Sequence, residues 1–152
     1  MTAIIRLRRL LPSIRQFAFT ATSGPGSKTG WNGKGQGTLE IIEANEQVRF
    51  VETGQFLLDG QSRSVPMRNV YRWVSGDERL SLLHERRGPE AAVHLFDLVQ
   101  AEDGESLVNE AVHQCVDDAY SAKLTLREGG FDLNWRIVGP KKNETIDYQY
   151  RR

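Results

Sequence analysis

Apolar and polar side chains alternate along most of this sequence, which is the pattern of β-strands that bury one face and expose the other. In the run from residue 65 to 73, alternating positions place five residues on one face: Val65, Met67, Asn69, Tyr71 and Trp73. Similar runs cover 80–87, 93–99, 120–127 and 131–137. Short turn sequences separate the runs, among them Asp59-Gly60, Gly76-Asp77, Gly88-Pro89 and Gly129-Gly130. Together with weaker runs on either side, they predict about ten antiparallel strands.

Ten antiparallel strands favour a closed arrangement, because an open sheet of that size leaves long unpaired edges. We therefore predict a mainly all-β protein, a single up-and-down antiparallel β-barrel, with a two-sheet sandwich as the alternative. Glycines at every second position from Gly33 to Gly37 predict a sharp bend in one strand. Apolar residues before Pro12 have helical spacing, which predicts a short N-terminal helix packed on the barrel. The expected organisation is one domain over residues 1–152, with the helix at 1–12 and the barrel at 13–152.

Charge and composition narrow the classes of partner. The chain has 20 basic and 20 acidic residues, so it lacks the basic excess of most nucleic-acid-binding domains. Arginines interrupt the apolar residues near the N-terminus, so we predict neither a secretory signal nor a spanning helix; a basic helix lying on a membrane surface is the alternative. The lone Cys115 excludes an internal disulfide and favours a reducing compartment. We accordingly expect a cytoplasmic protein without nucleic-acid or membrane partners, and we leave a homodimer open.

A few polar residues share strand faces with apolar ones, and these are candidates for chemistry inside the barrel. His84 and Arg86 follow two leucines on one face. Asp97 follows apolar residues on another strand, whereas alternation places His94 on the opposite face from Asp97. Buried charge needs a partner, so Arg86 with Asp97 or Glu52 would make an interior pair. The alternative is that these residues lie at the barrel mouth in contact with solvent.

Signals for metals and phosphates are weak. His113-x-Cys115 offers ligand types that zinc uses, but without the dense spacing of zinc motifs, so we expect no metal and an inert buried thiol. The glycine-rich segment 31–37 lacks the Lys-Ser/Thr of a phosphate loop. Lys141 and Lys142 form a basic turn, which we expect to be a solvated loop, with anion binding as the alternative. We expect no cofactor.

Several motifs resemble known families. Trp31-x-Gly33-x-Gly35 at the start of a strand resembles the opening of calycin-type barrels, the group of lipocalins, fatty-acid-binding proteins and nitrobindin-like proteins. Other segments resemble a family of small bacterial domains without an assigned function: Tyr71-Arg72-Trp73, His94-Leu95-Phe96-Asp97, His113-x-Cys115-x-x-Asp118-x-Tyr120 and Trp135-Arg136-Ile137-Val138-Gly139-Pro140-Lys141-Lys142. The resemblance spans residues 10–152 or so and implies a calycin-like barrel with a polar cluster, but it supplies no activity. Haem-binding nitrobindin-like barrels use a histidine near the C-terminus; because no histidine follows His113, we do not expect haem.

The first hypothesis for function is a binding protein for a small, largely apolar ligand with a polar group, held inside the barrel. The residues expected to line the wall are Tyr71, Trp73, Tyr120 and Trp135, and those expected to orient the polar end are His84, Arg86, His94, Asp97 and His113. Arg136 completes the predicted ligand-binding set.

The second hypothesis is an acid–base enzyme of isomerase, lyase or decarboxylase type in the same pocket, since histidine titrates near neutral pH. It requires at least two of a set of five residues to converge on one cavity: His84, His94, His113, Asp97 and Asp118. A third hypothesis, a structural or interaction module, would be favoured by an apolar patch on the outer face.

Overall fold

The computed structural model describes residues 1–28, 30–111, 113–115 and 117–152, and of residues 113–115 it describes the backbone alone. Its helices are α1 (Ala3–Leu10) and the short 3-10 helices η1 (Leu11–Ser13) and η2 (Pro89–Ala91). The strands of the first half are β1 (Gln16–Ser23), β2 (Gly33–Ala44), β3 (Gln47–Leu58), β4 (Val65–Gly76) and β5 (Arg79–His84). Those of the second half are β6 (Val93–Gln100), β7 (Ser106–Asn109), β8 (His113–Cys115), β9 (Asp118–Arg127), β10 (Gly130–Val138) and β11 (Asn143–Arg151).

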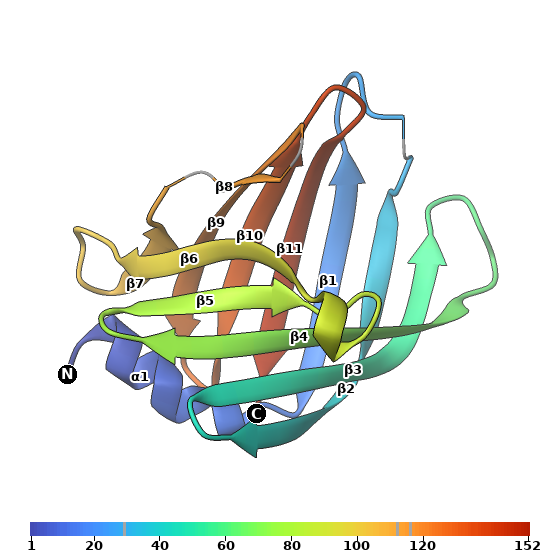
Figure 1. The fold of residues 1–152 in the computed structure, drawn as a ribbon. Coiled ribbons are helices and arrows are strands. Elements are labelled where there is room, and N and C mark those ends of the chain that lie inside the picture. The colour runs from blue at the N-terminus through green and yellow to red at the C-terminus, as the bar shows by residue number, and fades with distance from the viewer. Residues whose placement is uncertain (29, 112, 116) are drawn as a thin grey trace.

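The strands form a closed antiparallel barrel (Figure 1). From β1 to β7 each strand pairs with the next along the chain, and β7 pairs with β9. The ring closes because β10 pairs with both β9 and β11, and β11 pairs with β1. Ten strands thus make the ring within the described part of the chain, while the short β8 also pairs with β9. The predicted barrel of about ten strands with a short N-terminal helix is confirmed, and the sandwich alternative is wrong.

The long strands β2 and β3 approach each other closely where two glycines face each other. Gly37 and Gly54 are register partners. A Cβ atom on Gly37 would collide with the backbone carbonyl of Thr53, and one on Gly54 would collide with the carbonyl of Gln36. The backbones therefore pack at a distance that only glycine allows, as expected for a strand bent at a barrel corner.

One end of the barrel is filled. The side chain of Thr2 caps α1 by accepting a hydrogen bond from the Ile5 amide, and the helix buries Ala3, Ile4 and Leu7. The helix lies across the end where β4 finishes and β5 begins (Figure 1). Above it Trp73 packs edge-on against two phenylalanine rings, with centroids 6.0 Å from Phe50 and 5.8 Å from Phe131. This half of the interior is solid core.

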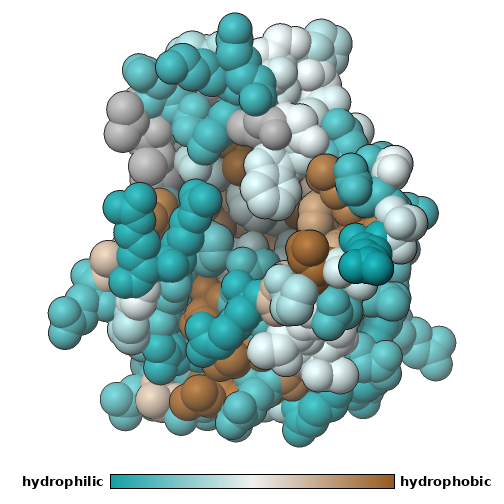
Figure 2. Space-filling view, turned by 90° about the vertical axis from the view of Figure 1, so that its right-hand side faces the viewer, coloured by the Kyte–Doolittle hydropathy of each residue, from teal (hydrophilic) through white to brown (hydrophobic). Residues whose placement is uncertain are grey.

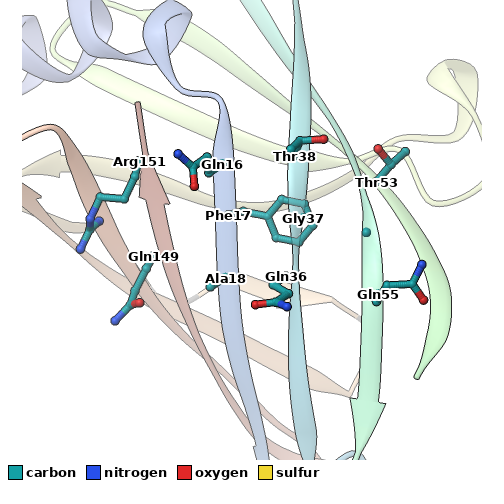
Figure 3. Close-up of a pocket in the computed structure, with 11 residues that line it drawn as sticks. Gln16, Phe17, Ala18, Gln36, Gly37, Thr38, Thr53, Gln55, Gln149 and Arg151 are labelled. Atoms are coloured by element: carbon teal, nitrogen blue, oxygen red, sulfur yellow. The ribbon is translucent and has the colours of Figure 1, made fainter. Parts of the chain in front are cut away.

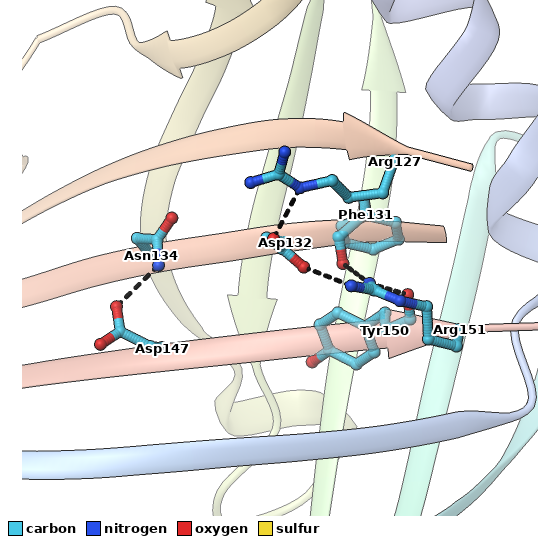
Figure 4. A network of polar contacts seen from close by, with 7 residues as sticks. All are labelled: Arg127, Phe131, Asp132, Asn134, Asp147, Tyr150 and Arg151. Atoms are coloured by element: carbon cyan, nitrogen blue, oxygen red, sulfur yellow. Dashed lines mark hydrogen bonds and ion pairs between the residues drawn. The ribbon is translucent and has the colours of Figure 1, made fainter. Parts of the chain in front are cut away.

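The outer surface carries polar ladders between neighbouring strands. On β9–β11, Asp132 accepts hydrogen bonds from Arg127 at 2.8 Å and from Arg151 at 2.9 Å (Figure 4). On β3 and β4, Arg49 and Arg72 donate to Glu85, whose side chain is buried. These ion pairs lie on the outer wall of the barrel, and none of their residues lines the cavity inside it.

Among the described residues no helix has the length and apolar character needed to cross a bilayer.

Candidate functional site

A pocket of about 510 Å³ opens at the end of the barrel opposite α1. It lies where β1, β3, β5 and β10 end and where β4, β6, β9 and β11 begin. Its apolar wall includes Phe19, Trp31, Phe56, Met67, Leu95, Tyr120, Trp135, Ile137 and Ile146. Figure 2 shows this side of the molecule hollowed, with hydrophobic side chains inside and hydrophilic ones around them.

Polar side chains gather at one part of the wall. The His84 ring stacks on the ring of Tyr71, with centroids 4.7 Å apart and planes 20° apart. Burial and the charge of Arg86 lower the pKa of His84 to about 4, so the ring is neutral at pH 7. Burial raises the pKa of Tyr71 well above its ordinary value, so its hydroxyl keeps its proton. Tyr71, His84 and Arg86 therefore offer the pocket a hydroxyl, a neutral imidazole and a guanidinium.

A carboxyl group lies behind this wall. Glu52 is fully buried, and its two oxygens accept hydrogen bonds from the hydroxyls of Tyr148 at 2.8 Å and Tyr150 at 2.6 Å. Burial raises the pKa of Glu52 to about 8, because the loss of solvation outweighs both hydrogen bonds. The ring of Tyr148 packs edge-on against the ring of Tyr71, with centroids 6.0 Å apart, and both tyrosines line the pocket. Tyr148 thus joins the pocket wall to a buried carboxyl.

The structure brings five of the ten predicted ligand-binding residues to this pocket: Tyr71, His84, Arg86, Tyr120 and Trp135. Trp73 does not line it. It shares a strand face with Tyr71 but lies two residues nearer to α1, inside the solid core. Its indole N–H has no hydrogen-bond partner among the described residues.

His94 and Asp97 lie outside the barrel, and the expectation that they occupy opposite faces is wrong. Leu82 pairs with Phe96 and Leu83 with His94, so β6 contains one extra residue at this point. The bulge reverses the alternation beyond it, and as a result two consecutive residues, Leu95 and Phe96, are both buried. His94 Nε2 therefore lies 2.8 Å from Asp97 Oδ1. Although burial opposes ionisation, hydrogen bonds from Ser81 and His94 lower the pKa of Asp97.

The remaining predicted residues do not converge on the pocket. Arg136 points outward and donates to Asn143 Oδ1 at 3.0 Å, because it alternates with the inward-facing Trp135. Asp118 lies 3.3 Å from the amine of Lys142, which is a pocket residue. His113 and Cys115 have side chains outside the described part of the structure.

The expected interior ion pair of Arg86 is also wrong. Asp97 faces outward, and the two hydrogen bonds of Glu52 come from tyrosines rather than from arginine. The sequence suggested Glu52 only as an ion-pair partner of Arg86, and it did not identify Tyr148 as a site residue. The signal available for both was their place on alternating, mostly apolar faces near Phe50 and Tyr150.

A second hollow, of about 570 Å³, lies on the outer face of β11, β1, β2 and β3 (Figure 3). Amide and hydroxyl side chains dominate its lining: Gln16, Gln36, Thr38, Thr53, Gln55 and Gln149. Among its described lining residues the charged one is Arg151, which already bonds to Asp132. The residues described in this hollow do not combine an aromatic wall with a cluster of titratable groups, as those inside the barrel do.

Comparison with known proteins places this fold in a family. A family model described as a family of unknown function (DUF6314) matches residues 18–152, which is most of the chain. No curated protein matches. The barrel has the closed antiparallel form predicted from the calycin resemblance, and no named calycin family is identified.

Proposed function

The chain belongs to this family of unknown function, and from its pocket we propose that it binds a small, largely apolar molecule carrying a polar group. The observation that carries the proposal is a cavity of about 510 Å³ with an aromatic wall and a cluster of polar groups on one side. Small-molecule sites are typically concave and mostly apolar, with a few polar groups that fix orientation.

The aromatic wall of the pocket favours a ligand whose apolar part is flat or chain-like. Phe19 and Phe56 stack with centroids 5.9 Å apart, and Tyr120 stacks on Trp135 at 6.4 Å. Trp31 stands at the rim with 57% of its surface exposed. Aromatic surface held open to water is unfavourable, and an apolar ligand removes it from water.

The polar cluster would receive the polar end of the ligand. Arg86 is solvent-exposed on the pocket side, and its charge acts on both Tyr71 and His84. A neutral His84 ring has one donor and one acceptor nitrogen, and Arg86 adds up to five N–H donors. The polar group of the ligand is therefore expected to be rich in hydrogen-bond acceptors.

The test is a fluorescence titration with N-phenyl-1-naphthylamine, an uncharged aromatic probe. We expect saturable binding to the wild-type protein. Ala21 lines the pocket and Ala18 lies on the outer hollow of the same strand, so Ala21→Trp and Ala18→Trp form a matched pair. Ala21→Trp is expected to weaken binding about tenfold or more by filling the cavity, and Ala18→Trp is expected to leave it unchanged.

Absence of binding, or equal binding by the two tryptophan variants, would overturn the proposal. Native mass spectrometry of the purified protein gives a second measurement, because a co-purifying ligand should be lost in Ala21→Trp and retained in Ala18→Trp.

The acid–base enzyme is not proposed. It requires at least two of its five candidate residues in one cavity, and His84 alone of them lines the pocket within the described part of the chain. His94 and Asp97 bond to each other on the outer wall, and Asp118 pairs with Lys142.

A further inference from the structure

Glu52 is a buried acidic group that the proposed binding function does not use. It has no exposed surface, and no ion pair of Glu52 occurs among the described residues. Its hydrogen-bond partners are the neutral hydroxyls of Tyr148 and Tyr150. A carboxylate without a cationic partner is unfavourable in such a place, whereas a protonated carboxyl is readily accommodated.

Tyr148 connects this group to the pocket. Its hydroxyl bonds to Glu52, and its ring lies in the pocket wall edge-on to the ring of Tyr71. With Glu52 ionised, the O–H of Tyr148 points toward the carboxylate, and its oxygen has only lone pairs left for other partners. With Glu52 protonated, the carboxyl can donate to Tyr148 instead, and the O–H of Tyr148 can then donate toward the pocket.

The fixed charges of the pocket favour an anion. Arg68, Arg86 and Lys142 line it, and Glu144 is its one carboxylate among the described lining residues. Glu144 accepts hydrogen bonds from Ser23 and Ser27, both at 2.5 Å. Lys142 pairs with Asp118, which leaves the two arginines as the positive groups that form no ion pair in the described part of the chain.

We propose that the pocket selects an organic anion, and that Glu52 takes up a proton when that anion binds. An anion in the pocket can gain a donated hydrogen bond from Tyr148 only when Glu52 is neutral. An ionised Glu52 would also repel the anion across a few side chains of low dielectric. The inference rests on the proposed binding function and names the ligand class and its coupling.

Glu52 changes charge between pH 6.5 and 9, and the described groups packed against it do not. The groups packed against it are Tyr71 from β4 and Tyr148 and Tyr150 from β11, and burial raises the pKa of all three above the ordinary tyrosine value. The pKa of His84, on β5, is about 4, below this interval. Glu52, with a pKa of about 8, changes charge in that interval.

The experiment compares two probes with the same aromatic skeleton. 1-Anilinonaphthalene-8-sulfonate carries a sulfonate that is ionised throughout, and N-phenyl-1-naphthylamine carries no charge. Between pH 6.5 and 9 the protonated fraction of Glu52 falls about tenfold, so the sulfonate should bind about tenfold more weakly at pH 9. The neutral probe should change by less than about twofold.

Variants assign the effect. Glu52→Gln should bind the sulfonate equally at both pH values, and Asp97→Asn, on the outer wall, should keep the wild-type dependence. Tyr150→Phe removes a hydrogen bond to Glu52 without touching the pocket, and should move the midpoint to higher pH. Calorimetry in two buffers of different ionisation enthalpy at pH 8.5 should show uptake of roughly 0.8 proton per sulfonate bound to the wild type.

The outcomes separate the two proposals. If neither probe binds, the proposed function fails. If the neutral probe binds and the sulfonate binds without pH dependence or proton uptake, the function stands and the coupling is wrong. A pH dependence that persists in Glu52→Gln would also refute the role of Glu52, and the calorimetric result on the wild type decides the question even where that variant does not fold.

Discussion

Replacing Glu52 with glutamine should remove a loss of stability that the wild-type protein undergoes as the pH rises. Glutamine has nearly the shape of a protonated glutamate. Its carbonyl oxygen can accept from one tyrosine hydroxyl and its amide can donate to the other, so the contacts with Tyr148 and Tyr150 are retained. The change therefore removes the ionisation and little else.

The sign and size follow from the two pKa values. The pKa of Glu52 is about 8 in the folded protein, against 4.5 for the free side chain. Between these two pKa values the folded state binds more protons than the unfolded state. The free energy of unfolding therefore falls as the pH rises through that interval. At about 1.4 kcal/mol per pKa unit, the full effect is at most about 5 kcal/mol. About 2 kcal/mol of it falls between pH 6.5 and 9.

The pH interval is chosen to keep the contribution of His84 small. Burial lowers the pKa of His84 to about 4, so this residue makes stability rise with pH between about 4 and 6.5, in the opposite direction. At pH 6.5 the ring is still about half protonated in the unfolded state, so His84 adds a rise of about 0.4 kcal/mol above that pH, which is small beside the Glu52 effect and common to wild type and Glu52→Gln.

Urea unfolding followed by the fluorescence of the three tryptophans measures the effect at pH 6.5 and at pH 9. The wild type should lose about 2 kcal/mol of unfolding free energy between them, and Glu52→Gln should lose little. Asp97→Asn should behave as the wild type does, because hydrogen bonds hold the pKa of Asp97 below its ordinary value. An equal decline in wild type and Glu52→Gln would refute a buried, titrating Glu52.

Three further outcomes are expected. Glu85→Ala should cost about 3 kcal/mol in urea unfolding at pH 7, since it leaves Arg49 and Arg72 without their shared carboxylate. Gly37→Ala should cost more than about 2 kcal/mol in the same assay, because its Cβ would meet backbone, whereas Gly76→Ala meets a flexible Arg79 side chain at 3.2 Å and should stay within about 1 kcal/mol. His94→Ala should leave the affinity for N-phenyl-1-naphthylamine unchanged, while His84→Ala should weaken it severalfold; the reverse order would place the site on the outer wall.

Alternation along the strands predicted the barrel because successive side chains of a strand point to opposite faces. The faces can therefore be read from neighbouring residues in the sequence alone. Alternation identified Tyr71, His84, Tyr120 and Trp135 as candidates, all of which line the pocket. It could not show how far along the barrel axis an inward-facing residue lies, and so whether it belongs to the pocket or to the filled end. Trp73 has the same parity as Tyr71, and only the position of α1 and of Phe131 decides that it belongs to the filled end.

Alternation also fails where a strand contains an extra residue. The bulge in β6 depends on how β5 pairs with it, and no glycine or proline within β6 marks the place. His94 and Asp97 were therefore assigned to opposite faces although their side chains bond to each other. For Arg136 the information was present, since it alternates with Trp135 and so had to face outward.

The environment of Glu52 is the clearest case of what only closure of the barrel can decide. Its place after Val48 and Phe50 on an apolar face indicates that it points inward. Its partner Tyr148 is 96 positions away on a strand that does not pair with β3, so the two meet across the interior. An ionised carboxylate is best stabilised by a cation, which is why the sequence suggested Arg86 as the partner of Glu52. A carboxyl that stays protonated needs only hydroxyl partners, which two tyrosines supply. The choice of tyrosine over arginine is thus what leaves the pKa of Glu52 high enough for the carboxyl to hold a proton near neutral pH, as the proposed coupling to an anion requires.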